Sequence, residues 1–321
     1  MTIQFLRRGL AAGLLGLLAA GAGAAERPSD LDWPDTPEKA AAQTLVGQFN
    51  EVKEVLKTRD GQFRGVSLTG RGTNERASMT IAVDPETGLV QEIKGNGVGV
   101  TNDQFAWFVP FSELRVLSLH HNSDKSLSKD ELREVCDGAG LAKLKGNAAL
   151  EEVMLPGGPF DADGLRAVAE LTQLKRLGAW HVWASGEDFA ALRNHPGLES
   201  VRLGQTWNPT FADTLLEILS TCPNMTRISL GEGYVTWEGG LQHLTKLKGT
   251  LETLELRSAV VAPEDLERIK QAMPGVEVKH EGMAAVGQKI ASNYKGANKK
   301  LTGAVPQELL DRYVAAAKEA E

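Results

Sequence analysis

The residues best suited to catalysis or metal binding form the segment His120-His121-Asn122-Ser123-Asp124. Two adjacent imidazoles beside a carboxylate could hold a metal ion or transfer a proton. Elsewhere the sequence has no H-E-x-x-H motif, no second cluster at metal-ligand spacing, no G-x-S-x-G motif and no phosphate-binding glycine loop. We therefore expect no catalytic residue, no metal and no cofactor, while an enzyme centred on His120 and His121 remains an alternative.

Aromatic residues form a second group that could do chemistry, because they recur at a regular spacing. Trp183, Trp207 and Tyr234 each lie four residues after the last apolar position of a repeated motif. If the repeats stack, we expect these three side chains to form an exposed ladder along one edge, flanked by Trp180 and Trp237. Flat apolar faces with a polar tip suit contacts to a protein partner or to sugar rings. The alternative is that they cover a thin rim and one another.

Arginines form the third group. We expect Arg176, Arg202 and Arg227 at equivalent sites on three adjacent strands, as a basic column in an otherwise acidic protein. Such a column could receive an acidic partner or a carboxylate-bearing glycan. Neighbouring acidic residues such as Glu199 and Glu217 could instead neutralise it.

An apolar motif positions all of these residues. One apolar residue precedes a second by three positions and a third by five, and successive motifs are 27, 24, 36, 24, 24, 27, 26 and 22 residues apart. The nine motifs are Phe63/Val66/Leu68, Val90/Ile93/Gly95, Leu114/Leu117/Leu119, Leu150/Val153/Leu155, Leu174/Leu177/Ala179, Leu198/Val201/Leu203, Met225/Ile228/Leu230, Leu251/Leu254/Leu256 and Met273/Val276/Val278. Self-similarity at this period is typical of a solenoid, in which each repeat adds one layer to a continuous core.

The residues after each motif resemble those of leucine-rich-repeat proteins of the ribonuclease-inhibitor-like class, in particular the short bacterial exported type. The segments that carry the resemblance are Leu230 to Thr236 with Gly240-Leu241, and Leu155 to Phe160 with Asp163-Gly164-Leu165. It covers about residues 63–280. The resemblance implies an α/β fold, a right-handed horseshoe solenoid with a parallel concave sheet, outer helices and helical caps. It also implies a binding scaffold without catalytic residues.

The N-terminal part of the chain precedes this array. Residues 1–24 contain Arg7-Arg8, a short apolar stretch and an Ala22-Gly23-Ala24 cleavage site, which predicts a signal peptide; a membrane anchor is the alternative. Residues 25–62 are expected to be a leader and a capping helix over about 37–57. Export would place the protein in the periplasm or outside the cell, with no membrane insertion of the mature chain.

The solenoid is expected over residues 63–282, with about eight to nine repeats. A β-hairpin is an open alternative for its first repeat, because Met79 to Val83 and Leu89 to Lys94 flank a turn sequence. An insertion over residues 120–144 is either one extra helical turn or a binding loop. Residues 283–321 are expected to be a polar linker, over Lys295 to Gly303, and a C-terminal helix from Pro306 to Ala320.

Charge and cysteine content exclude further classes. The net charge is −7, and becomes −9 without residues 1–24, so we expect no nucleic-acid partner. Cys136 and Cys222 lie about three repeats apart, too far for a disulfide, so both are expected to be buried thiols. The sequence therefore predicts a non-enzymatic exported scaffold that binds a protein partner through its concave face and aromatic edge. The alternative is a carbohydrate-binding module that uses Trp183, Trp207 and Tyr234.

Overall fold

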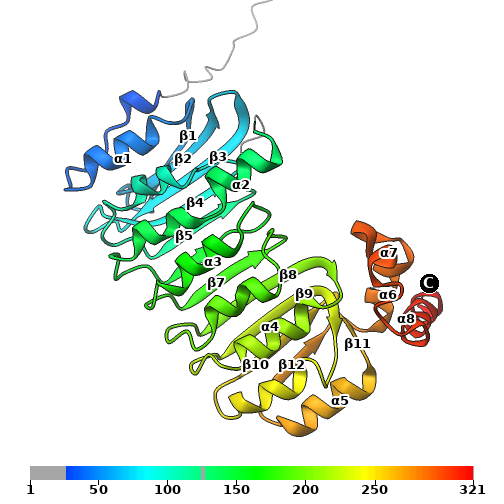
Figure 1. The fold of residues 1–321 in the computed structure, drawn as a ribbon. Helices are drawn as coiled ribbons and strands as arrows, with labels where there is room; N and C mark the ends of the chain where they lie inside the picture. Colours follow the sequence, from blue (N-terminus) through cyan, green and yellow to red (C-terminus); the bar gives the residue numbers. More distant parts are fainter. Residues whose placement is uncertain (1–26, 124–126, 321) are drawn as a thin grey trace, which may run out of the picture.

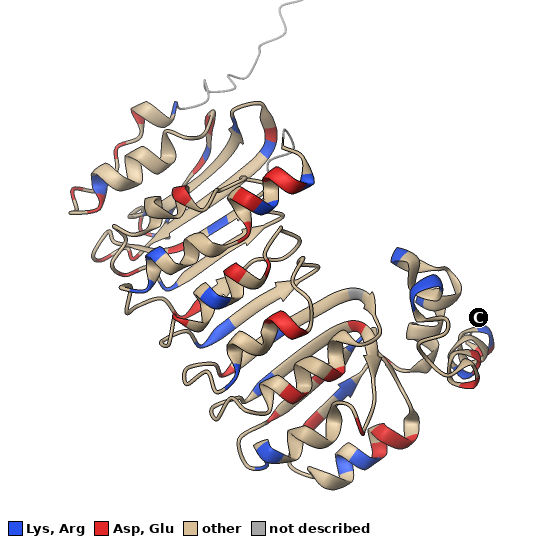
Figure 2. Ribbon diagram, in the orientation of Figure 1, with Lys and Arg blue, Asp and Glu red and all other residues tan. Residues whose placement is uncertain are grey.

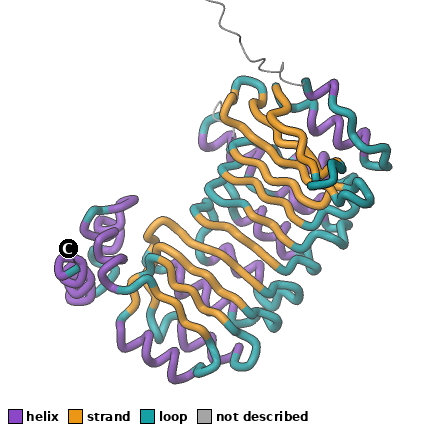
Figure 3. The backbone as a smooth tube through the Cα atoms, turned by 180° about the vertical axis from the view of Figure 1, so that it is seen from behind, coloured by secondary structure: helices purple, strands orange, loops and turns teal. Residues whose placement is uncertain are grey.

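The computed structural model describes residues 27–123 and 127–320. The predicted signal peptide, residues 1–24, lies outside the described residues, as do residues 124–126 of the predicted insertion. One sheet of twelve strands runs through this part of the chain, with short helices along one of its faces (Figure 1). Figure 3 presents the opposite side, where the strands lie in front of the helices.

An antiparallel meander opens the sheet. It follows a short turn of helix (η1, Pro28–Asp30) and helix α1 (Lys39–Val46), and its strands are β1 (Glu51–Lys57), β2 (Phe63–Arg71), β3 (Asn74–Val83) and β4 (Val90–Asn96). Each strand pairs antiparallel with the next. Of the two possibilities for the first repeat, the hairpin is therefore the observed one, and Phe63, Val66 and Leu68 belong to β2.

The predicted capping helix over 37–57 was wrong in extent. Helix α1 ends at Val46, and residues 51–57 form a strand that pairs with β2. The Gln43 carbonyl accepts a hydrogen bond from the backbone N–H of the C-cap Gly47, at 2.9 Å, and the Leu45 carbonyl accepts one from the Gln48 N–H, at 3.1 Å. Val52 and Val55 stand three apart, a spacing that fits a helix face, but Val52 packs into the sheet core instead.

From β4 onward the strands are parallel and repeat the predicted unit. They are β5 (Val116–His120), β6 (Glu152–Met154), β7 (Arg176–Trp180), β8 (Ser200–Asn208), β9 (Arg227–Val235), β10 (Thr253–Arg257) and β12 (Glu277–His280), while β11 (Val260–Val261) pairs with β9. The middle apolar residues align across eight strands: Ile93, Leu117, Val153, Leu177, Val201, Ile228, Leu254 and Val278. This is a leucine-rich-repeat-like α/β fold.

Helical segments return the chain from each strand to the next. They are η2 (Asp103–Phe108), α2 (Lys129–Cys136), η3 (Ala139–Leu144), α3 (Ala162–Ala169), η4 (Glu187–Leu192), α4 (Phe211–Leu219), η5 (Leu241–Leu247) and α5 (Pro263–Ala272). Their inward leucines, such as Leu165, Leu215 and Leu244, are fully buried in the same core as the strands. Charged residues of both signs are interspersed along these helices (Figure 2).

The insertion adds helix α2 to one repeat. The Ser128 hydroxyl caps it by accepting from the Glu131 backbone N–H, and the Glu131 carboxylate accepts from the Ser128 backbone N–H. Cys136, at the end of α2, and Cys222 are both buried and are not joined in a disulfide, as predicted.

A helical unit closes the chain. It consists of α6 (Met283–Ala291), η6 (Tyr294–Gly296), α7 (Ala297–Leu301) and α8 (Gln307–Glu319). The predicted linker over Lys295 to Gly303 was wrong, because most of it is α7, whereas the predicted last helix matches α8. The unit has an apolar core of its own, distinct from the repeat core, and lies beside the carboxyl ends of the later strands. None of the helices in the described ranges combines the length and apolarity that a bilayer span requires.

Candidate functional site

The three arginines of the predicted basic column do not share one register. Arg176 on β7 aligns with Ser200 on β8, and Ser200 aligns with Arg227 on β9. Arg202 lies two residues further along β8, opposite Gly178 and Ser229. The prediction of equivalent sites was therefore wrong for Arg202, which occupies the next outward-facing row of the sheet.

Two of these arginines are neutralised within the chain. Arg176 bonds to Glu152, with an Nε–Oε2 distance of 2.6 Å, and its guanidinium lies 3.7 Å from the Glu151 carboxylate. Arg227 forms an ion pair with the buried carboxylate of Glu255. Neutralisation thus comes from acids on neighbouring strands, whereas Glu217, one of the acids we expected, pairs with Arg193 on the helical face.

Arg202 differs from both. Its guanidinium stacks over the Trp180 indole, 4.3 Å from the ring centroid, and no carboxylate within the described ranges forms an ion pair with it. Burial and the positive charge of Arg257 lower the pKa of Arg202, against an opposing effect of Glu255. Arg202 is therefore a cation held in a fixed position without a counter-ion among the residues that the structure describes.

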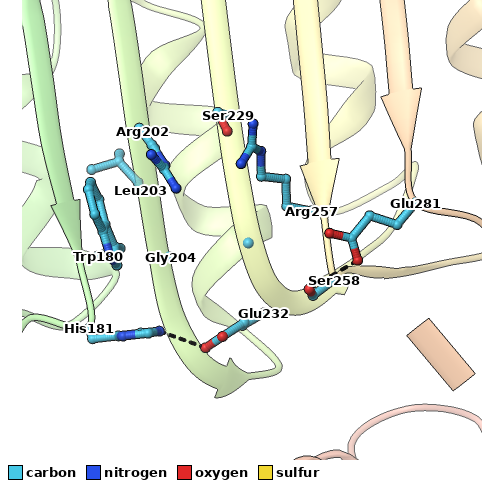
Figure 4. A pocket seen from close by; sticks show the side chains of 11 residues that line it. Trp180, His181, Arg202, Leu203, Gly204, Ser229, Glu232, Arg257, Ser258 and Glu281 are labelled. Atoms are coloured by element: carbon cyan, nitrogen blue, oxygen red, sulfur yellow. Dashed lines mark hydrogen bonds and ion pairs between the residues drawn. The ribbon is translucent and has the colours of Figure 1, made fainter. Parts of the chain in front are cut away.

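Arg202 lines a hollow of about 200 Å³ on the strand face. Gly204 on β8 and Gly231 on β9 align with each other and leave the floor without side chains. Trp180 and Arg202 form one wall, and Arg257 on β10 the opposite one (Figure 4). Arg257 keeps one intramolecular bond, from its Nε to the Glu255 carboxylate at 3.2 Å.

Two residues with left-handed backbone supply the remaining wall of the hollow. His181 directly follows β7, whereas Glu232 lies within β9, and their φ angles are 57° and 56°. His181 Nε2 lies 2.8 Å from the Glu232 carboxylate, and Lys295 Nζ of the C-terminal unit lies 3.2 Å from it. Burial raises the pKa of Glu232, but bonds from His181 and Lys295 outweigh burial and hold this pKa below its ordinary value.

The predicted aromatic ladder is interrupted. Trp207 has an exposed fraction of 0%, because it packs into the core of the C-terminal unit against residues such as Tyr313 and Val260. Tyr234 aligns with Val260, as the repeat spacing predicts, and is half-buried against the same cluster. The prediction that Trp207 is exposed was therefore wrong. The edge is a docking surface here, but its occupant is the chain's own C-terminus.

The other predicted aromatics are dispersed. Trp183 lies beneath the insertion, with Lys129 Nζ 5.1 Å and the Arg133 guanidinium 5.3 Å from its ring centroid. Trp237 lies on the helical side, 4.5 Å from the Arg268 guanidinium on α5. Of the five predicted aromatic residues, only Trp180 reaches the hollow.

The described part of the histidine segment, His120 to Ser123, adjoins this face, whereas Asp124 lies outside the described residues. The His120 and Trp180 rings meet edge to face, with their centroids 5.9 Å apart. Burial and the neighbouring charges of His121 and Arg202 lower the pKa of His120.

A cluster of aspartates lies on the helical side of the sheet. Asp137, Asp161 and Asp163 bring carboxylate oxygens within 4.8 Å of one another. Asp137 already accepts from Asn102 and Ala139, and Asp163 pairs with Arg166.

The predicted site residues did not include Arg257, which lines the hollow, or Lys295, which bonds to the lining residue Glu232. Arg257 aligns with Gly231 and Gly204, so the repeat count could have placed it beside the glycine floor. Lys295 comes from the C-terminal unit, 63 residues after its partner Glu232, and no spacing rule connects the two.

The comparisons with known proteins give remote neighbours. No family model and no curated protein matches the chain. Among solved structures, it is similar to an internalin C2 from Listeria monocytogenes, with 16% identity, coverage of 81% of this chain and 88% of that chain, and a TM-score of 0.38. It is also similar to a plant peptide hormone receptor, RGFR1, solved in complex with RGF2, with 13% identity and a TM-score of 0.29. That match covers 55% of this chain and a third, 33%, of the receptor.

Proposed function

We propose that this protein is a non-enzymatic leucine-rich-repeat scaffold, of the horseshoe ribonuclease-inhibitor-like kind, that binds a protein partner through its strand face. The observation that carries this proposal is the hollow around Arg202, where a stacked guanidinium without a carboxylate partner in the described ranges faces outward. A polar face over a continuous apolar core suits recognition, because the core supports the shape while the outward residues are free to contact a ligand.

Export is part of the same proposal. The basic pair, short apolar stretch and A-x-A site of residues 1–24 support a cleaved signal peptide. The partner would then be a protein of the cell envelope or of the exterior. Trp180 is the aromatic contact that we favour, and Trp183 remains a second candidate at the edge. The carbohydrate alternative gains no support, because its middle residue, Trp207, is enclosed.

Crosslinking capture from the native envelope fraction tests this function. The baits are the wild-type protein, His120→Ala/Trp180→Ala on the strand face, and Trp237→Ala/Arg268→Ala on the helical face. Each variant removes one tryptophan and one side chain that contacts its ring, and circular dichroism checks that both are folded. We expect one identified protein, which also binds when purified, to be captured by the wild type and the helical-face variant and lost by the strand-face variant. Equal capture by all three baits would contradict binding through this face, and the absence of any specific protein would contradict protein binding.

A further inference from the structure

We propose that the hollow between Arg202 and Arg257 binds a carboxylate of an acidic peptide segment. This inference rests on the protein-binding function proposed above, and it names the chemistry that the site would recognise.

The hollow carries an excess of positive charge. Three carboxylates line or border it, and each has a cationic partner: Glu232 with Lys295, Glu255 with Arg227, and Glu281 with Lys289. Arg202 has no such partner among the residues that the structure describes, and Arg257 shares Glu255 through its Nε alone. In a chain with a net charge of −7, this is a local cationic site that a negative group would complete.

The two guanidinium groups are placed on either side of one strand. Arg202 on β8 and Arg257 on β10 flank β9, and Figure 4 shows the Arg257 side chain reaching over β9 near Ser229, with Arg202 on the other side of that strand. Stacking on Trp180 restricts the Arg202 side chain, so little conformational freedom is lost when it binds. A guanidinium presents parallel N–H donors that match the two oxygens of a carboxylate.

The glycine floor gives such a group room to enter. Gly204 and Gly231 align with Trp180 on one side and Arg257 on the other, in one row across four strands. The two glycines therefore leave a depression between two long side chains. A side chain at Gly204 would crowd the Gly231 backbone, 3.0 Å from an added Cβ. A volume of about 200 Å³ accommodates an acidic side chain or a chain terminus, but not a folded element.

An acidic peptide fits better than an acidic glycan. Sugar rings bind proteins by stacking on an exposed aromatic face. Trp180 is the only Trp, Tyr or Phe that lines the hollow within the described ranges, and Arg202 already covers a face of its ring. A peptide needs no such face, because its carboxylate can bind the two guanidinium groups.

Fluorescence anisotropy with a defined probe tests the proposal. The probe is a fluorescein-labelled, end-capped peptide of alternating glutamate and glycine, at low ionic strength, with the glutamine version as its neutral control. The proteins are the wild type, Arg202→Gln and Arg176→Gln, where Arg176 is an arginine of the same face that is already paired with Glu152. Polygalacturonate, used as a competitor, represents the glycan source of carboxylates.

We expect the glutamate peptide to bind the wild type at least about tenfold more tightly than the glutamine peptide, and Arg202→Gln to weaken it by about tenfold or more. Arg176→Gln should change binding by less than about twofold. Equal effects of the two substitutions, equal binding of the two peptides, or no binding of the glutamate peptide would overturn the proposal. Competition by polygalacturonate that depends on Arg202 and exceeds that of unlabelled glutamate peptide would overturn the assignment to peptides.

The failure of this inference is distinguishable from failure of the proposed function. If the envelope partner is captured equally by wild type and Arg202→Gln but lost by His120→Ala/Trp180→Ala, the scaffold function stands and the carboxylate site does not.

Discussion

The two ends of the repeat array are closed in different ways. At the N-terminal end, strands β1 to β4 continue the same sheet, and their apolar residues belong to the same core as the repeats. At the C-terminal end, helices α6 to α8 form a separate core and contact the array at its edge, through Trp207 and Val260. One cap therefore extends the solenoid, and the other is a second body attached to it.

The difference determines what each cap contributes to stability. A strand ladder joins β4 to β5 along five aligned residue pairs, so the meander and the first repeats should unfold together. Besides the apolar contacts with Trp207 and Val260, the C-terminal unit is held by the Tyr313 hydroxyl and by a few ion pairs. The hydroxyl bonds to the Val261 N–H and carbonyl at 2.9 and 2.8 Å. A region with its own core and few connections can open locally while the rest stays folded.

The largest expected effect comes from equal core truncations in the two caps. Ile81→Ala in β3 and Ile290→Ala in α6 each remove a buried isoleucine side chain and should destabilise their region by about 2–5 kcal/mol. We expect Ile81→Ala to lower the urea midpoint of the whole array. Ile290→Ala should leave that midpoint in place and increase hydrogen exchange only within residues 283–320. Loss of protection throughout the array in both variants would show that the two caps are equally integrated.

A smaller effect is expected from the hydroxyl that seats the C-terminal unit. Tyr313→Phe keeps the ring but leaves the Val261 N–H and carbonyl without their partner, which should destabilise docking by about 1–3 kcal/mol. Burial raises the pKa of Tyr313 to about 12 from an ordinary 10.0. The protonated phenol therefore stabilises docking fully below pH 10, and this contribution is lost as the pH rises from 10 towards 12.

Limited trypsin digestion from pH 8 upward checks this prediction, with cleavage within residues 283–320 as the readout. We expect Tyr313→Phe to be cleaved faster at pH 8 and to lack the increase in cleavage that we expect of the wild type above pH 10. Tyr294→Phe is the matched control, since Tyr294 lies in the same unit but is 45% exposed. An alkaline transition that persists in Tyr313→Phe would assign it to another group.

The repeat part of the fold was readable from the sequence because one apolar residue per repeat points into the core at a constant register. Ile93 and Leu254 belong to one row although 161 positions separate them in the chain. The meander was ambiguous for a physical reason. Its strands alternate apolar and polar residues as repeat strands do, so Val66 and Leu68 fit both structures, and only the antiparallel pairing distinguishes them.

The candidate site was less predictable, because it depends on counts within a repeat and on contacts from outside it. We assigned Arg202 and Arg176 to the same row, although they lie on opposite sides of the second apolar residue of their motifs. Arg202 follows Val201, whereas Arg176 precedes Leu177. Trp207 holds the predicted position in its repeat, but a register shift between Gly204 and Asn208 and the docked C-terminal unit enclose it. Repeat spacing carries no information about a helical unit that folds back onto the array.

The smallest expected effect concerns the bond between that unit and the hollow. Burial raises the pKa of Glu232, but bonds from His181 and Lys295 outweigh burial and lower this pKa. The ionised carboxylate therefore stabilises the contact with Lys295 above the ordinary pKa of 4.5, and this stabilisation is lost as the pH falls below 4.5. We expect opening of residues 294–301 to increase by less than about 1 kcal/mol between pH 6 and pH 3.5, because the Lys295 side chain is partly exposed. Hydrogen exchange corrected for intrinsic rates measures this opening.

Two variants test the role of the carboxylate. Glu232→Gln should show the acid-state opening already at pH 6. Glu267→Gln, which breaks an exposed pair with Lys270 on α5, should behave as the wild type. If Glu232→Gln kept the wild-type pH dependence, the contact with Lys295 would have no part in holding the C-terminal unit to the strand face.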